Sequence, residues 1–161
     1  MSTVNKISGR SLILTVALAA LAAGWSAGSV RAQTGTNALK MDFINPTRGR
    51  FSGAVVVHAG GFKVIYVSGH TGRGTDLKSQ ATAAYQNLVK ELAAAGAKPN
   101  DVVKLNTYIA NFVPEDRTAY EEAKRASFPQ DDLPASTMVG VQSLISPQSR
   151  IEVEAVAMVK E

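Results

Sequence analysis

The chain has 161 residues, no cysteine, two histidines and a formal net charge of +4 at pH 7. The lack of cysteine excludes disulfides, a thiol nucleophile and thiolate metal ligands, and two histidines are too few for a histidine-rich metal centre. No Lys/Arg cluster is interleaved with aromatic residues, so the basic charge does not indicate nucleic-acid binding. We therefore expect neither a metal site nor a nucleic-acid partner.

The N-terminal segment has the layout of a secretory signal peptide. Lys6 and Arg10 precede an apolar run over residues 12–23, and Val30-Arg31-Ala32 places small residues at the two positions that a signal peptidase reads. The alternative is an uncleaved N-terminal anchor, although the run is shorter than the ~20 apolar residues that a membrane span needs. The pattern predicts cleavage before Gln33.

Cleavage at this point changes the domain and charge assignments. Residues 1–32 are then a signal peptide, and residues 33–161 form one domain, located in the periplasm or secreted and without membrane contact. Three of the 17 basic residues lie in the signal peptide, so 14 basic residues remain against 13 acidic ones and the net charge falls to about +1. The remaining length is enough for a single domain.

The first part of this domain has residue patterns typical of β-strands. Residues 41–44 predict a short edge strand that ends at the turn signal Asn45-Pro46. Residues 54–58 and 62–68 are rich in β-branched and aromatic residues and are separated by Gly60-Gly61, which indicates a hairpin.

A helix follows the glycine-rich segment 69–74. That segment lacks both the P-loop and the dinucleotide spacing, so we interpret it as a turn and expect no cofactor. Thr75 or Asp76 can cap the helix at its N-terminus, and Gly96 occupies the position of a C-cap glycine. Apolar residues recur at three- and four-residue steps between these caps, at Leu77, Ala81, Ala84, Tyr85, Leu88 and Leu92.

The second half repeats this alternation of strand and helix. Residues 101–111 alternate as a strand, which predicts Val103, Leu105, Thr107 and Ile109 on one face and Lys104, Asn106 and Tyr108 on the other. Pro114 begins a helix that runs to about Phe128. Residues 135–144 and 150–160 predict the last two strands. The order β-β-β-α-β-α-β-β indicates the α+β class, with one sheet and helices on one face.

One face of the strand at residues 135–144 is small and uncharged. Its members are Ser136, Met138, Gly140 and Gln142. Such a face is typical of a strand that packs against a partner subunit or lines a cleft.

Short stretches spread over residues 65–157 occur in an order and spacing that resemble one known family. They are Tyr66-Val67-Ser68-Gly69, Asp76 with Gln80, Asn87-Leu88, Leu92 to Gly96, Asp101-Val102-Val103-Lys104, Leu133-Pro134-Ala135, and Ile151 to Ala155 with Ala157. The chain resembles the Rid (reactive intermediate deaminase, YjgF-type) family. The resemblance implies a chorismate-mutase-like fold, in which one mixed sheet of about six strands has two helices packed on one face. It also implies a homotrimer that binds small metabolites in clefts between subunits, and hydrolysis of enamines and imines of the 2-iminobutanoate/2-iminopropanoate type.

The resemblance also implies the site residues. In the family, an arginine directly after the Pro-Ala pair holds the substrate carboxylate with a planar fork. Here that position is Ser136, and Met138 stands where the family often has cysteine. Glu152 matches the family's pocket carboxylate, which assists the attack of water. Ser68 matches its pocket serine, and Phe51 falls near its pocket tyrosine.

Several of these assignments have structural alternatives. Arg73 is expected near the cleft mouth, where it either replaces the missing arginine from a neighbouring subunit or is a solvated loop residue. Glu152 and Glu154 alternate with apolar residues, so both can simply face solvent. Ser68 can be a strand-end residue bonded to the backbone, and His70 is expected to be structural.

The sequence leaves three functions open. The first is an exported enamine/imine deaminase that uses Glu152 and has altered selectivity. The second is a non-catalytic trimer that binds a small metabolite, and the third is a structural trimer whose cleft is filled by Met138 and Phe51. Ser136 favours the second function, whereas Glu152 and Ser68 favour the first.

Overall fold

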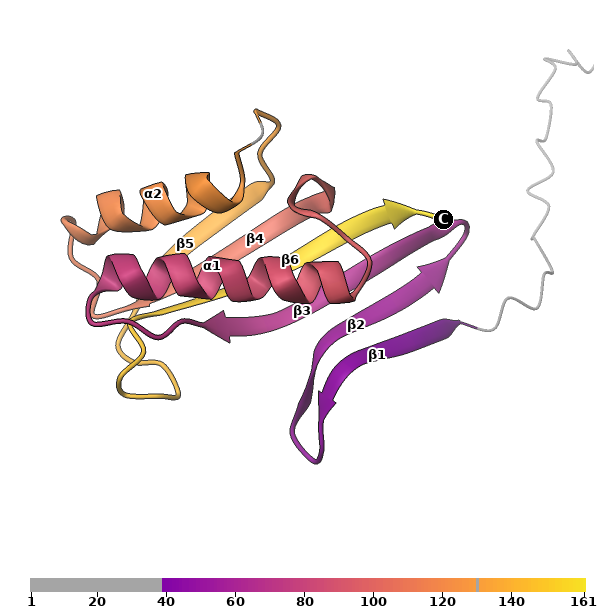
Figure 1. The fold of residues 1–161 in the computed structure, drawn as a ribbon, viewed down its shortest axis with the longest axis horizontal. Coiled ribbons are helices and arrows are strands. Elements are labelled where there is room, and N and C mark those ends of the chain that lie inside the picture. Colours follow the sequence, from indigo (N-terminus) through magenta and orange to yellow (C-terminus); the bar gives the residue numbers. More distant parts are fainter. Residues whose placement is uncertain (1–38, 130) are drawn as a thin grey trace, which may run out of the picture. The chain divides into compact units, whose positions relative to one another are not determined.

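The computed structural model describes residues 39–129 and 131–161, which form one sheet with helices on one face (Figure 1). The predicted signal peptide and the predicted start at Gln33 lie outside these residues. The strands are β1 (Lys40–Thr47), β2 (Phe51–Ala59), β3 (Phe62–Thr71), β4 (Val102–Ala110), β5 (Ala135–Val141) and β6 (Ile151–Lys160). The helices are α1 (Leu77–Ala94), α2 (Asp116–Ser127) and the 3-10 turn η1 (Pro99–Asp101).

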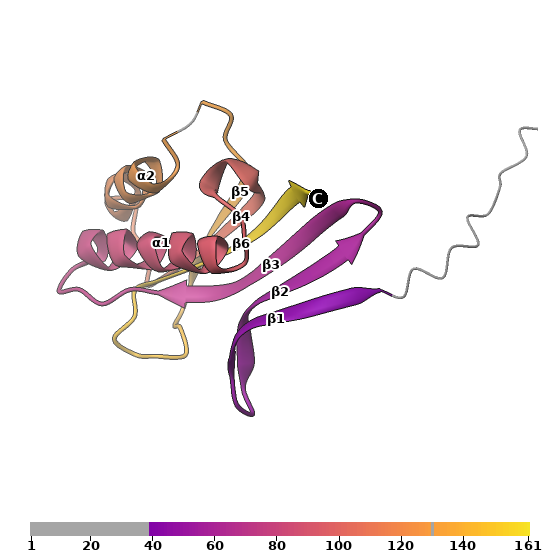
Figure 2. The ribbon, with the colours of Figure 1, turned by 45° about the vertical axis from the view of Figure 1, so that its right-hand side comes forward.

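The six strands form a single mixed sheet in the order β1-β2-β3-β6-β4-β5. Neighbouring strands are antiparallel except β4 and β5, which are parallel and are connected through α2. Both long helices cover the same face of the sheet, as Figure 2 shows. The predicted α+β class and element order are confirmed, and β6, the last strand in the chain, lies between β3 and β4.

Helix α1 supplies the centre of the core. Asp76 caps it: the Asp76 carboxylate accepts from the Ser79 backbone at 2.7 Å, and the Ser79 hydroxyl accepts from the Asp76 backbone at 3.2 Å. The six apolar residues predicted to line one side of this helix are all buried. Tyr85 is bonded through its hydroxyl to the Thr107 hydroxyl at 3.1 Å, which joins α1 to β4. The chain leaves the helix at Gly96, whose φ of 79° is left-handed.

Two predicted strand ends are wrong because strand pairing continues past local turn signals. Asn45 has a left-handed φ of 45°, yet β1 resumes pairing with β2 at Pro46 and runs to Thr47. Asn45 is held there by its amide, which donates to both carboxylate oxygens of Glu91 at 3.1 Å. Strand β3 likewise continues beyond Ser68, because residues 70 and 71 pair with β6.

The later strands also differ in detail from the prediction. A register shift between Val102 and Lys104 buries Val102 and leaves Val103 47% exposed, so Val103 does not share the face of Leu105. Strand β5 ends at Val141, three residues before the predicted end. Pairing with β4 stops at the same residue, so nothing extends the strand further.

Gly72 packs directly against α1. A Cβ atom at this position would overlap the carbonyl oxygen of Gln80 and the backbone nitrogen of Ala84, neither of which can move without breaking the helix. We expect Gly72→Ala to lower the free energy of unfolding by about 1–3 kcal/mol, measured by urea denaturation. Gly49→Ala is the control: nothing lies within 4 Å of an added Cβ there, but its φ is +72°. A Gly72→Ala loss no larger than that of Gly49→Ala would contradict steric overlap as the cause.

The face of the sheet opposite the helices is uncovered within the described residues. Alternating strand positions place apolar side chains on it, and several are strongly exposed: Met41, Phe43, Tyr66, Val139 and Met158. We call this surface the open face.

Neither long helix of residues 39–129 and 131–161 is long and apolar enough to cross a membrane.

Candidate active site

Two carboxylates of β6, Glu152 and Glu154, lie on the open face. Their alternate neighbours Ile151 and Val153 are fully buried under the helices. Glu154 accepts a hydrogen bond from the Asn106 amide at 2.9 Å and another from the Tyr108 hydroxyl at 3.0 Å. Glu154 is therefore held in place by β4, and the hydrogen bond from Tyr108 to Glu154 raises the pKa of Tyr108.

Glu152 has a different environment. It is half-buried, and no described side chain donates a hydrogen bond to it. Its carboxylate lies over Gly69, where a Cβ atom would overlap the Glu152 Oε1 atom. Burial raises the pKa of Glu152, and the charge of Glu154 raises it further. An unpaired carboxylate with a raised pKa is suited to proton transfer.

Ser68 and Phe51 lie at the same end of the sheet as Glu152. Ser68 is half-buried, directly precedes Gly69, and donates its hydroxyl hydrogen to the Ser52 carbonyl oxygen at 2.6 Å. Phe51 is the first residue of β2 and is 58% exposed. The chain therefore places these three predicted residues along three adjacent strands, β2, β3 and β6.

Ser136 and Met138 lie elsewhere. In the parallel register Ser136 is opposite Leu105 and Met138 is opposite Thr107, and both β4 residues are fully buried on the helix side. Met138 packs against the core. The small strand face that the sequence assigned to a partner subunit or cleft is thus turned toward the helices, and a single chain does not bring Ser136 to Glu152.

The two remaining loop candidates have separate positions. Arg73 is exposed in the segment between β3 and α1. His70 is a strand residue opposite Val153 on the helix side, with a buried Nε2 atom that has no hydrogen-bond partner. Burial lowers the pKa of His70, and the nearby Glu91 acts in the opposite direction.

Sequence reasoning missed three residues that shape this region. Asn106 and Tyr108 position Glu154, and Lys124 of α2 donates a hydrogen bond to the Ser136 hydroxyl at 3.0 Å. The alternation of β4 already placed Asn106 and Tyr108 on one face. Their hydrogen-bond partner Glu154 could not be predicted, because the strand order that places β6 beside β4 is not a local property of the sequence.

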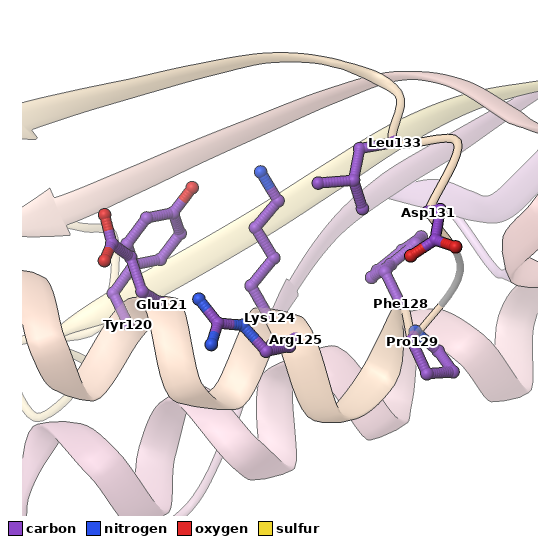
Figure 3. Close-up of a pocket in the computed structure, with 8 residues that line it drawn as sticks. All are labelled: Tyr120, Glu121, Lys124, Arg125, Phe128, Pro129, Asp131 and Leu133. Atoms are coloured by element: carbon purple, nitrogen blue, oxygen red, sulfur yellow. The ribbon is translucent and has the colours of Figure 1, made fainter.

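A surface hollow of about 450 Å³ lies between α2 and the loop that leads to β5 (Figure 3). Its lining residues are Tyr120, Glu121, Lys124, Arg125, Phe128, Pro129, Asp131 and Leu133. Within the described ranges, no group of three or more His, Asp or Glu side chains is arranged to hold a metal ion.

Comparison with known proteins matches this fold. A family model described as Endoribonuclease L-PSP matches residues 44–159. A solved member of the YjgF/YER057c/UK114 family from Mycobacterium tuberculosis is 28% identical, covering 74% of this chain and 100% of that chain, with a TM-score of 0.63. The chain belongs to the Rid (YjgF-type) family. The membership expected from the sequence is thereby confirmed. This Rid protein has serine at position 136, where the resemblance implied an arginine.

Two further relatives carry Rid-type names. A solved RidA from a Psychrobacter species is 26% identical, covering 75% of this chain and 98% of that chain, with a TM-score of 0.60. A protein of Dermatophagoides farinae named 2-iminobutanoate/2-iminopropanoate deaminase is 31% identical in an alignment of 104 residues that covers 60% of this chain and 78% of the relative.

Proposed function

We propose that this Rid protein is an exported enamine/imine deaminase that hydrolyses a C=N bond with Glu152 as the proton-transfer group. The observation that carries the proposal is the half-buried Glu152 carboxylate, which has a raised pKa and no hydrogen-bond partner in the described part of the chain. The name of the Dermatophagoides relative supports a 2-iminobutanoate or 2-iminopropanoate substrate.

The reaction consumes one water molecule and transfers both of its protons to the nitrogen through Glu152. Water adds to the imine carbon while the carboxyl group of Glu152 donates its proton to the nitrogen, and the resulting carboxylate accepts a proton from the attacking water, which gives a neutral carbinolamine. The same carboxyl group then protonates the amine nitrogen as the C–N bond breaks and accepts the hydroxyl proton, releasing ammonia and a 2-keto acid. A raised pKa suits this role, because a carboxyl group that titrates closer to neutral pH exchanges protons in both directions.

We propose a homotrimer with the substrate cleft between subunits. The open face supports association, because several large apolar side chains exposed on one face are typical of protein interfaces. The separation of Ser136 from Glu152 within one chain supports a cleft that takes residues from two copies. In such a cleft Phe51, Ser68 and Glu152 come from one subunit and the β5 edge from another.

Export remains part of the proposal on sequence grounds. The basic start, the apolar run and the Val30-Arg31-Ala32 pattern support removal of residues 1–32 and a location in the periplasm or outside the cell.

A second candidate function is binding of a small metabolite without turnover. Ser136 favours it, because serine lacks the charge and planar fork with which an arginine holds a carboxylate. A structural trimer without a ligand is the remaining alternative. It requires Met138 and Phe51 to fill the cleft, whereas Phe51 is exposed in the single chain.

Turnover separates these candidates. The purified protein is incubated with an L-amino-acid oxidase and L-2-aminobutyrate, so that the oxidase generates 2-iminobutanoate in the same solution. The rate of 2-oxobutanoate release is then measured. We expect release above the rate of oxidase and buffer alone. A rate equal to that background, with 2-oxobutanoate still bound by the protein, would support the binding function instead.

A further inference from the structure

Lys124 extends from α2 toward the edge of the sheet (Figure 3). Its ammonium group donates a hydrogen bond to the Ser136 hydroxyl at 3.0 Å and lies 6.0 Å from the centre of the Tyr120 ring. A lysine ammonium has three donors, so two remain for a ligand after the bond to Ser136. A cation therefore stands at the position where the family's arginine side chain would begin.

The charges around Lys124 leave it available to an anion. No carboxylate in residues 39–129 or 131–161 forms an ion pair with Lys124 or with its neighbour Arg125. Glu121 lines the same hollow, but it is bonded to Arg117 at 2.7 Å. Asp131, on the loop at the other end of the hollow, is the remaining carboxylate there.

We propose that Lys124 binds the carboxylate of the substrate in place of the missing arginine, with Ser136 fixing the position of its ammonium group. The proposal rests on the proposed function and names the residue that selects acidic substrates. Because an ammonium group is a point charge rather than a planar fork, we expect recognition that depends on the ligand's charge more than on its exact orientation.

The position of β5 makes this contact accessible. Strand β5 is the last strand of the sheet, so its outer edge has no strand neighbour in the described residues, and Ser136 is exposed there. Within one chain Lys124 lies on the helix side of the sheet and Glu152 on the open face. Lys124 of one copy therefore acts on a substrate that reaches Glu152 of another, as the proposed inter-subunit cleft requires.

Binding of the keto-acid product tests Lys124 without depending on turnover. Affinities for 2-oxobutanoate and for butanone, which lacks the carboxylate, are measured by titration on the full protein, Lys124→Met, Lys124→Arg and Lys90→Met. We expect Lys124→Met to weaken 2-oxobutanoate binding by about 10-fold or more and to leave butanone unchanged. Lys124→Arg keeps the charge and should stay within about 3-fold. Lys90 is an exposed lysine of α1 and serves as the control.

The outcomes separate this inference from the proposed function. Loss of 2-oxobutanoate binding in Lys124→Met without any turnover by the unmodified protein would sustain the role of Lys124 and reject the deaminase. Turnover by the unmodified protein, together with unchanged 2-oxobutanoate binding in Lys124→Met, would support the deaminase and reject the role of Lys124. A loss in Arg73→Met but not in Lys124→Met would assign the carboxylate to Arg73 and overturn the inference. Absence of 2-oxobutanoate binding by the unmodified protein would also overturn it.

Discussion

Replacing Glu152 by glutamine is expected to lower kcat/KM for 2-iminobutanoate by at least about 100-fold, because a positioned general acid–base group contributes about 10²–10⁴ in rate. Glutamine keeps the size of the side chain but cannot exchange a proton at neutral pH. The measurement is keto-acid release from oxidase-generated imine at several enzyme concentrations. Binding of 2-oxobutanoate is measured in parallel to show that the cleft is intact.

Glu154→Gln is the matched control for this prediction. Glutamine can still accept the hydrogen bonds that Asn106 and Tyr108 donate to residue 154, so the local structure is retained. We expect activity within about 10-fold of the unmodified protein. If Glu154→Gln loses as much activity as Glu152→Gln, or if Glu152→Gln remains fully active, the assignment of Glu152 is wrong.

Glu154→Gln is also expected to shift the pH profile of kcat/KM. The negative charge of Glu154 is the second cause of the raised pKa of Glu152, after burial. Glu154→Gln removes that charge, so the protonated form of Glu152 becomes easier to ionise and its pKa falls. The limb of the kcat/KM profile that reports Glu152 should therefore move to lower pH. Movement to higher pH would contradict the electrostatic explanation.

Placing charges on the open face is expected to convert the proposed trimer into monomers. Tyr66 and Met158 lie on the adjacent strands β3 and β6 and are 52% and 48% exposed in the single chain. Burying a carboxylate without a partner costs several kcal/mol, which is enough to dissociate an ordinary interface at micromolar concentration. Light scattering on Tyr66→Asp/Met158→Asp should give the monomer mass, and circular dichroism should show an intact fold.

Ile145 offers a control outside the open face. It is 97% exposed in the loop between β5 and β6, so Ile145→Asp places one carboxylate on exposed apolar surface away from the sheet. We expect this variant to keep the mass of the unmodified protein. A monomeric unmodified protein at micromolar concentration would reject the trimer, and an intact trimer in the double variant would show that the open face is not the interface.

The helices illustrate how much of the fold could be predicted. The side of α1 that packs on the sheet was visible as a three- and four-residue repeat, and Asp76 and Gly96 marked its ends. These signals are local, since capping and amphipathic burial depend on residues within one or two turns. Strand ends were less predictable: β1 passes through Asn45 because pairing with β2 outweighs a turn signal.

The candidate site was predictable only in part. The order of short motifs identified the family and, through it, Glu152 and Ser136. Which of two alternating glutamates is unpaired depends on Asn106 and Tyr108, which lie 46 positions or more from Glu154 along the chain. No local pattern contains that information, because it arises only when β6 is inserted beside β4.

Local periodicity and short motifs were sufficient for the α+β class, the element order and Rid membership, because these follow from residues close together in the chain or from their order along it. Long-range packing decided which side of the sheet the side chains of the candidate site face. It turned Ser136 toward α2 rather than toward the open face and set Lys124 against it. It also left Glu152 without a partner while Glu154 was bound. Such contacts join segments from three parts of the chain, so they exist only once the sheet and its helices have packed together.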